Sequence, residues 1–193
     1  MEKTILVVTG LPGSGKSEVS DYIKSLGIPM FRTGDVIREE VTRRGLELNP
    51  KNSEMISRKL REEEGMDAPA RRVGESIKSA NSDIVCVEGP RDMHEIDFLA
   101  TLGQVFMLII DAPVGTRFMR SVSRKGSEKE PKTRDPKTLL EFKWRDRKEM
   151  ERGLGEVIST KKFNMHVINN TGSKQQLYNE INSIIQELKA GTQ

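Results

Sequence analysis

The chain has 193 residues, of which 32% are charged and 35% hydrophobic, and its formal net charge at pH 7 is +3. This length provides one sizeable core, so we expect a single domain over residues 1–193. The mild charge and the aromatic content of 5% give no indication of a nucleic-acid partner. Cys86 is the single cysteine, which excludes an internal disulfide, and its apolar surroundings predict that it is buried.

Five short apolar runs are predicted strands. They are rich in β-branched residues, too short for helices, and lie at residues 4–9, 29–33 (the weakest), 84–88, 105–111 and 165–169. Longer, charged and periodic segments separate them. This alternation predicts an α/β fold with three layers around a parallel five-stranded sheet.

The helix signals agree with this alternation. A mostly helical insert is expected at about residues 36–80, and Asp35 is predicted to cap its first helix. The Asp-Pro pair at 135–136 predicts a helix start, and glycines 153 and 155 are predicted to end that helix. Ser173 with Gln176 forms a capping-box pattern. The terminal helix behind it should present an apolar face of Leu177, Ile181, Ile184, Ile185 and Leu188.

Residues at about 121–134 carry no apolar pattern, which is typical of a mobile surface loop. Their basic residues, and their position after a strand and a short helix, are equally compatible with a lid that covers phosphates. No run approaches the roughly 20 apolar residues that span a bilayer, and no signal peptide is visible. We therefore expect no membrane contact and a cytoplasmic location.

The clearest motif is Gly10-Leu11-Pro12-Gly13-Ser14-Gly15-Lys16-Ser17, which fits G-x-x-x-x-G-K-[ST] at every fixed position. It follows a predicted strand and opens a predicted helix from Ser17 to about Leu26. Backbone N–H groups and the helix N-terminus can then surround anionic oxygens. Lys16 can reach the β- and γ-phosphates, and the Ser17 hydroxyl can coordinate Mg²⁺. The predicted ATP ligands here are Gly10, Gly13, Ser14, Gly15, Lys16 and Ser17.

A P-loop needs a carboxylate near the metal, usually at the end of a neighbouring strand. Glu88 ends the third predicted strand and is the stronger candidate, either as a direct Mg²⁺ ligand or through a bound water. A structural or capping role is its alternative. Asp111, at the end of the fourth strand, is the weaker candidate.

Two further segments resemble those of a known family. Thr33-Gly34-Asp35-Val36-Ile37-Arg38 and Glu88-Gly89-Pro90-Arg91 are similar to the acceptor segments of adenylate kinases. Over nearly the whole chain, the sequence resembles the adenylate-kinase-related proteins known mostly from archaea. The resemblance implies that Arg38 and Arg91 hold the acceptor phosphate. The residues that it assigns to the acceptor are Thr33, Gly34, Arg38, Gly89 and Arg91.

The resemblance extends to later residues. Arg117 and Arg120 resemble the arginines that introduce the lid. Arg145 and Arg147 resemble those that close on the transferring phosphate, although surface salt bridges would explain all four. Asn170 lies in a loop similar to the one near the donor adenine. The catalytic residues implied are Lys16, Arg91, Arg117, Arg120 and Arg145, with ATP and Mg²⁺ as cofactors.

The chain departs from the family pattern in the phenylalanine missing before Pro90 and, with more consequence for the acceptor, at position 95. Where adenylate kinases carry a glutamine that pairs with the acceptor adenine, this chain has Glu95. A carboxylate can accept from the adenine amino group but cannot donate to a ring nitrogen. Glu95 therefore does not select AMP as the glutamine would, although it still permits AMP to bind, and the expected acceptor is AMP or a related phosphate-bearing molecule.

The sequence thus predicts an ATP-dependent phosphotransferase of the nucleoside monophosphate kinase type, as a monomer or a homodimer. A dephospho-coenzyme-A-kinase-like enzyme is a rival because it shares the fold and an acid-x-x-arginine after the second strand. A regulatory protein that binds AMP and ATP, with weak ATPase activity, also fits, since binding and chemistry use the same residues. A GTPase would need a guanine-reading Asn-Lys-x-Asp segment, which the sequence lacks.

Overall fold

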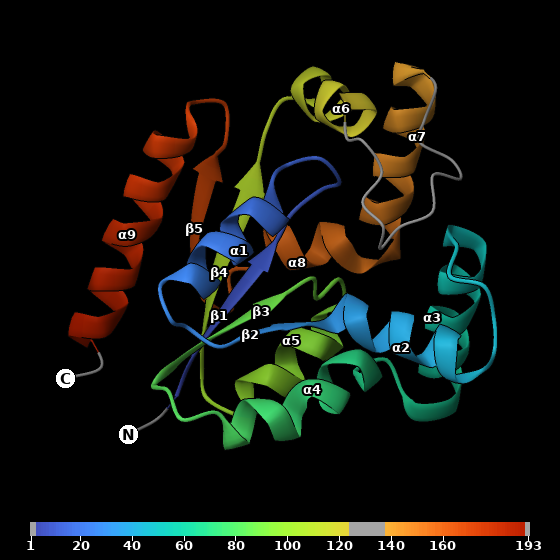
Figure 1. Cartoon of the computed structure of the whole chain (residues 1–193), viewed down its shortest axis with the longest axis horizontal. Coiled ribbons are helices and arrows are strands. Elements are labelled where there is room, and N and C mark those ends of the chain that lie inside the picture. Colours follow the sequence, from blue (N-terminus) through green and yellow to red (C-terminus); the bar gives the residue numbers. More distant parts are fainter. Residues whose placement is uncertain (1–2, 124–137, 192–193) are drawn as a thin grey trace.

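A parallel sheet forms the centre of the computed structural model, which describes residues 3–123 and 138–191 (Figure 1). Within these residues the sheet has five strands in the order β2-β3-β1-β4-β5. They are β1 (Thr4–Thr9), β2 (Met30–Arg32), β3 (Ile84–Glu88), β4 (Gln104–Asp111) and β5 (Asn164–Asn169). Every neighbouring pair is parallel, so the predicted α/β sheet is confirmed.

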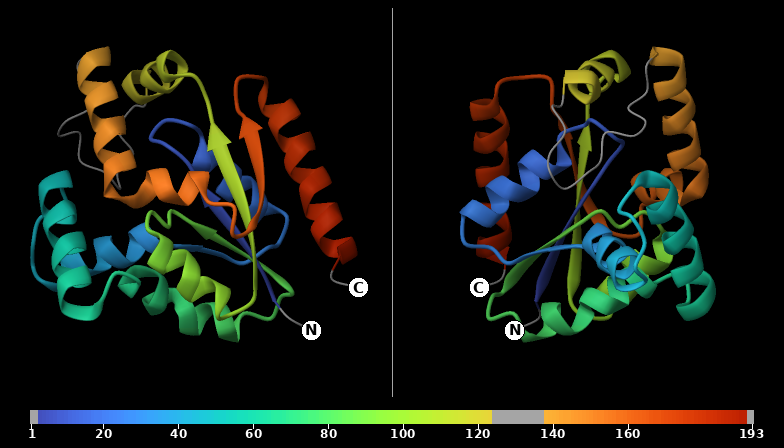
Figure 2. Two further views of the ribbon diagram at one scale, coloured as in Figure 1. Left: turned by 180° about the vertical axis from the view of Figure 1, so that it is seen from behind. Right: turned by 45° about the vertical axis from the view of Figure 1, so that its right-hand side comes forward.

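Helices cover both faces of the sheet (Figures 1 and 2). Strand residues alternate between the faces, so Leu6 and Cys86 pack with α1 (Lys16–Ser25) and α9 (Lys174–Gly191). Val7 and Val85 pack on the opposite face, which is covered by α4 (Ala68–Ser79), α5 (Met93–Ala100) and α8 (Gly155–Ser159). The three predicted layers are therefore present, and Cys86 is fully buried as predicted.

The insert between β2 and β3 is helical, as predicted, and consists of α2 (Thr33–Arg43), α3 (Pro50–Glu64) and α4. The prediction that Asp35 caps a helix starting at residue 36 is wrong. Helix α2 begins at Thr33, directly after β2, so Asp35 lies inside the first turn and binds Arg38. A carboxylate in this turn still favours the helix, because it faces the positive end of the helix dipole.

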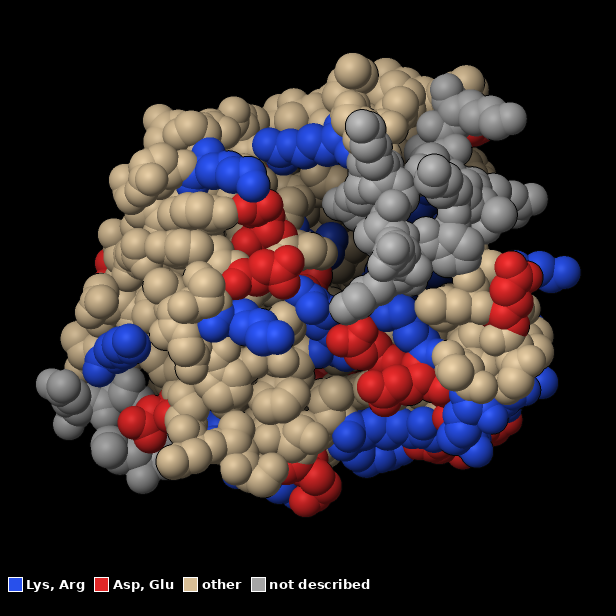
Figure 3. Space-filling model, in the orientation of Figure 1, with Lys and Arg blue, Asp and Glu red and all other residues tan. Residues whose placement is uncertain are grey.

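Glu40 holds the insert together. It is 1% exposed and binds Arg43 and Arg44 of its own segment and Arg72 of α4. Figure 3 shows basic and acidic side chains side by side in the region of α2 and α3. A buried carboxylate of this kind requires such partners, because burial of an unpaired charge is costly.

After β4 the chain forms α6 (Val114–Ser123), then α7 (Leu139–Glu149) and a π-helical turn, η1 (Met150–Leu154), that leads into α8. The predicted lid lies outside the described residues beyond Ser123, as does the Asp-Pro pair at 135–136. The described start of α7 is capped by Thr138, whose hydroxyl accepts from the Glu141 N–H at 3.2 Å. The predicted end at Gly153 is confirmed, because Gly153 (φ +118) leaves the helical conformation and separates two helices at a kink. The prediction for Gly155 is wrong, since Gly155 is the first residue of α8.

The capping box before α9 is confirmed. The Ser173 N–H donates to Gln176 Oε1 at 2.8 Å, and the Gln176 N–H donates to the Ser173 hydroxyl at 3.3 Å. The apolar face of α9 packs on the sheet as predicted, through Leu177, Ile181, Ile184, Ile185 and Leu188. No helix in the described ranges is long and apolar enough to cross a membrane.

Candidate nucleotide-binding site

The G-x-x-x-x-G-K-S motif forms the connection between β1 and α1. Gly13 has φ +77, and a Cβ atom there would lie 2.5 Å from the Arg117 carbonyl oxygen. Gly15 has φ +105, and its Cβ atom would lie 2.2 Å from Asn170 Nδ2. Both positions therefore require glycine. The loop ends at the N-terminus of α1, where unpaired N–H groups and the helix dipole favour an anion.

Lys16 and Ser17 are the first two residues of α1. Lys16 Nζ donates to the Leu11 carbonyl at 3.0 Å, which holds the side chain across the loop. The Ser17 hydroxyl donates to Glu88 Oε1 at 3.0 Å. The two predicted metal ligands are thus brought together, because β3 is the sheet neighbour of β1.

The Ser17–Glu88 pair fits a magnesium ion. Mg²⁺ prefers oxygen ligands and commonly takes only one or two from the protein, with waters and substrate phosphates as the rest. In the described ranges, no group of three or more His, Cys, Asp or Glu could hold a metal by itself. The weaker candidate, Asp111, is exposed at the end of β4, on the other side of β1 from Glu88.

Arg32 also binds Glu88. It lies opposite Glu88 in the register of β2 and β3, so both side chains point to the face covered by α1. Arg32 Nε donates to Glu88 Oε2 at 2.6 Å, and Arg32 Nη2 lies 2.5 Å from Asp21 Oδ1 on α1. Each oxygen of Glu88 therefore has its own donor.

Arg117 and Arg120 reach the P-loop from α6. Arg117 is buried, and its three nitrogens bind the Ala112 carbonyl (2.8 Å), the Pro12 carbonyl (3.2 Å) and Asp146 of α7 (2.7 Å). Arg120 donates to the Ser14 carbonyl at 3.3 Å and to the Asn170 carbonyl at 2.9 Å. Both arginines thus support the loop through its backbone carbonyls, and direct contact with a phosphate stays a prediction.

Asn170 lies beside the same loop. Its Nδ2 donates to the Ser14 carbonyl at 2.8 Å, which joins the segment after β5 to the P-loop. A pocket of about 230 Å³ is lined by residues 168–173 together with Gln176, Leu177 and Glu180 of α9. The predicted adenine segment therefore borders a hollow next to the phosphate cradle.

The two predicted acceptor segments touch each other. The Thr33 hydroxyl donates to the Glu88 carbonyl at 3.5 Å, and a Cβ atom on Gly89 would lie 3.3 Å from Thr33 Oγ1. Gly34 packs against the Arg38 guanidinium, which binds Asp35. Arg91 Nη1 donates to Glu149 of α7 at 2.6 Å. Each proposed acceptor arginine is therefore held by a carboxylate in this state.

Glu95 is turned away from solvent. It is 1% exposed, and its Oε1 accepts from Arg61 Nη2 of α3 at 2.8 Å. Burial raises the pKa of this carboxyl group, against the opposing effect of Arg61. Glu95 of α5 thus forms an ion pair with α3 of the insert.

Arg145 and Arg147, which the resemblance places at the transferring phosphate, lie exposed on α7.

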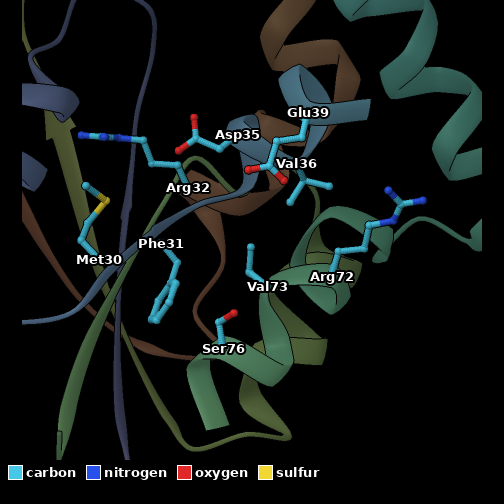
Figure 4. A pocket seen from close by; sticks show the side chains of 9 residues that line it. All are labelled: Met30, Phe31, Arg32, Asp35, Val36, Glu39, Arg72, Val73 and Ser76. Carbon is cyan, nitrogen blue, oxygen red and sulfur yellow. The ribbon is translucent and has the colours of Figure 1, made fainter. Parts of the chain in front are cut away.

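A second hollow, of about 460 Å³, lies between β2, α2 and α4 (Figure 4). Its lining includes Arg32 and Arg72, but Figure 4 shows their guanidinium groups pointing away from each other on opposite sides. Both are already paired, with Glu88 and Glu64 respectively. This hollow therefore lacks the converging cations that bind a phosphate.

Comparison with known proteins assigns the chain to a family. The profile of AAA_17, described as an AAA domain, matches residues 9–137. A UPF0200 protein of Hyperthermus butylicus is 40% identical over 157 residues, which cover 81% of each chain. The chain belongs to the UPF0200 family. Another UPF0200 protein, from Methanosarcina barkeri, is 40% identical over 169 residues, which cover 86% of this chain and 87% of that one.

Solved structures share the fold of this UPF0200 chain. TT1252 from Thermus thermophilus has a TM-score of 0.60 at 22% identity, covering 97% of this chain and 99% of its own. Shikimate kinase from Acinetobacter baumannii, solved in complex with shikimate, has a TM-score of 0.57 at 17% identity, covering 98% and 96%. At these identities the likeness establishes the three-layer P-loop kinase fold.

Sequence reasoning on the UPF0200 chain missed Arg32, Asp146 and Glu149. Arg32 could have been found, because it lies next to the end of the strand predicted at residues 29–33, at the same sheet edge as Glu88. Asp146 and Glu149 gave no such signal. They lie in a charged helix, and only the packing of α7 brings them to Arg117 and Arg91.

Proposed function

We propose that this protein is an ATP-dependent phosphotransferase that acts on a small phosphate-bearing acceptor, namely AMP or a related nucleoside monophosphate. One observation carries the proposal. Glu88 binds Ser17 of the P-loop, and the next residue, Gly89, packs against Thr33 at the start of α2. The candidate donor and acceptor segments therefore meet at one strand end, as transfer between two bound phosphates requires.

In this proposal ATP binds to residues 10–17, with Lys16 at its terminal phosphates and Mg²⁺ held by Ser17 and Glu88. The bound metal supplies charge neutralisation at the β- and γ-phosphates. Arg38 and Arg91 would exchange Asp35 and Glu149 for the acceptor phosphate, since both ion pairs are partly exposed. An acceptor oxygen forms a bond to the γ-phosphorus while the bond to the β,γ-bridging oxygen breaks, and ADP leaves. The acceptor is already ionised, so no general base is needed, and positioning with charge neutralisation supplies the rate.

The proposal is tested by ADP release from ATP–Mg²⁺ with a panel of nucleoside monophosphates and dephospho-coenzyme A, followed by chromatography of the products. We expect a phosphorylated product from a nucleoside monophosphate. A product from dephospho-coenzyme A alone would assign the rival kinase activity. ADP and phosphate without an acceptor product, together with AMP binding, would assign a regulatory protein with weak ATPase activity.

A further inference from the structure

Arg32 joins three elements at the candidate metal site. It comes from the end of β2, binds Glu88 at the end of β3 and binds Asp21 on α1, the helix that the P-loop opens. Its guanidinium donates directly to the same Glu88 carboxylate that accepts from the Ser17 hydroxyl. We propose that Arg32 is a positioning residue that lets the Ser17–Glu88 pair take a divalent cation only together with nucleotide phosphates. This inference rests on the proposed function.

The first step concerns orientation. Glu88 Oε2 accepts from Arg32 Nε at 2.6 Å, while Glu88 Oε1 accepts from the Ser17 hydroxyl at 3.0 Å. The bond from Arg32 to Asp21 holds the guanidinium from its other end. Because the Glu88 side chain is 10% exposed and bound on both oxygens, it presents a single oxygen at the P-loop. Glu88 therefore offers a cation one oxygen in a fixed direction, instead of a bidentate carboxylate.

The second step concerns charge. A cation that approaches without nucleotide meets a Glu88 carboxylate whose charge is partly offset by Arg32, which also binds the exposed Asp21. The Lys16 ammonium, bound to the Leu11 carbonyl of the P-loop, adds a further positive charge. Like charges within a few ångströms disfavour each other, and the effect is strong where water is largely excluded. Nucleotide phosphates bring negative charge to the loop and reverse this balance. The bare site should thus bind a divalent cation weakly, and the nucleotide-loaded site should bind it well.

The test measures binding of Mn²⁺, used as a spectroscopic probe for the site, to nucleotide-free protein by electron paramagnetic resonance. We expect Arg32→Met to bind Mn²⁺ about tenfold more tightly than the wild type, because one positive charge near the cation is gone. Arg32→Lys keeps the charge and should stay close to the wild type. Arg152→Met, which removes an arginine from an exposed pair with Glu54, is the matched control and should change nothing.

Equal Mn²⁺ affinity in Arg32→Met and the wild type would overturn the proposal, as would equal tightening in the Met and Lys variants. Arg32→Gln replaces Arg32→Met if the latter does not fold, which circular dichroism decides. No acceptor or turnover enters this measurement. If Arg32→Met binds Mn²⁺ no more tightly than the wild type while phosphoryl transfer is detected, the role of Arg32 alone is rejected. If Arg32→Met binds Mn²⁺ more tightly but no phosphoryl transfer is detected, the proposed transferase is rejected.

Discussion

Replacing Asp146 by alanine removes the carboxylate that binds Arg117, the arginine that donates to the Pro12 carbonyl of the P-loop. The two side chains are 12% and 5% exposed, and Arg117 Nη2 lies 2.7 Å from Asp146 Oδ2. The variant leaves a guanidinium buried without its counter-charge. Removal of one partner from a buried ion pair costs about 3–5 kcal/mol of the free energy of unfolding. Arg117 keeps its bonds to the Ala112 and Pro12 carbonyls, so we expect the lower end, about 3 kcal/mol.

For a domain of this size, each kcal/mol lowers the melting temperature by roughly 2–4 °C, so Asp146→Ala should melt roughly 6–12 °C below the wild type. Thermal and urea unfolding followed by circular dichroism measure the loss. Glu54→Ala is the matched control, because it removes a carboxylate from an exposed pair with Arg152 and should cost under about 1 kcal/mol. If Asp146→Ala costs no more than Glu54→Ala, the buried pair does not hold the loop as described.

A double variant separates stability from nucleotide binding. Arg117→Met combined with Asp146→Leu leaves no unpaired charge in the interior, so it should recover part of the stability that Asp146→Ala loses. Its ATP affinity, measured by calorimetry, should stay reduced, because the bond to the Pro12 carbonyl is gone. Full recovery of ATP affinity would show that Arg117 does not support the P-loop.

Three further changes have defined outcomes. Gly13→Ala places a Cβ atom 2.5 Å from the Arg117 carbonyl oxygen at φ +77, so calorimetry should show at least about a tenfold loss of ATP affinity; unchanged affinity would refute the loop geometry. Arg43, Arg44 and Arg72 hold the pKa of Glu40 well below its ordinary value of 4.5, so its contribution to stability is present above that pH and is lost as the pH falls below it. Urea unfolding from about pH 7 to about pH 3 should therefore show a flatter acid limb for Glu40→Gln, and parallel curves would contradict this. Arg91→Ala should raise the acceptor KM about tenfold or more while the ATP dissociation constant changes by less than about twofold, whereas equal losses would remove Arg91 from the acceptor site.

The core of the fold could be predicted because its signals are local. Apolar runs such as residues 84–88 and the capping box at Ser173 are set by neighbouring residues, and they formed where expected. The boundaries that failed depended on context. Thr33 belongs to α2 because β2 already ends at Arg32. Gly155 does not end a helix but begins α8, whose Val157 packs in one core cluster with Leu99 of α5.

The candidate site also has a part that local sequence predicts and a part that depends on packing. The P-loop and its approach to Glu88 follow from one motif and from parallel strands whose ends share an edge. The partners of the arginines could not be predicted from the sequence. Arg91 pairs with Glu149, which is 58 residues away, and Arg117 pairs with Asp146, which is 29 residues away, and both pairs form only when the helices pack. Glu95 shows the same limit. A position expected at the acceptor is buried against Arg61, and nothing in the local sequence indicates that pairing.

Transfer of labelled phosphate tests the central claim most directly. The protein is incubated with Mg²⁺, ATP labelled at the γ-phosphate, and a mixture of nucleoside monophosphates, and the label is followed by chromatography. We expect the label to appear on a nucleoside diphosphate made from the acceptor with the wild type, and to be absent from acceptors with Lys16→Ala. Label found solely in inorganic phosphate, or undiminished transfer by Lys16→Ala, would contradict the proposed phosphotransferase.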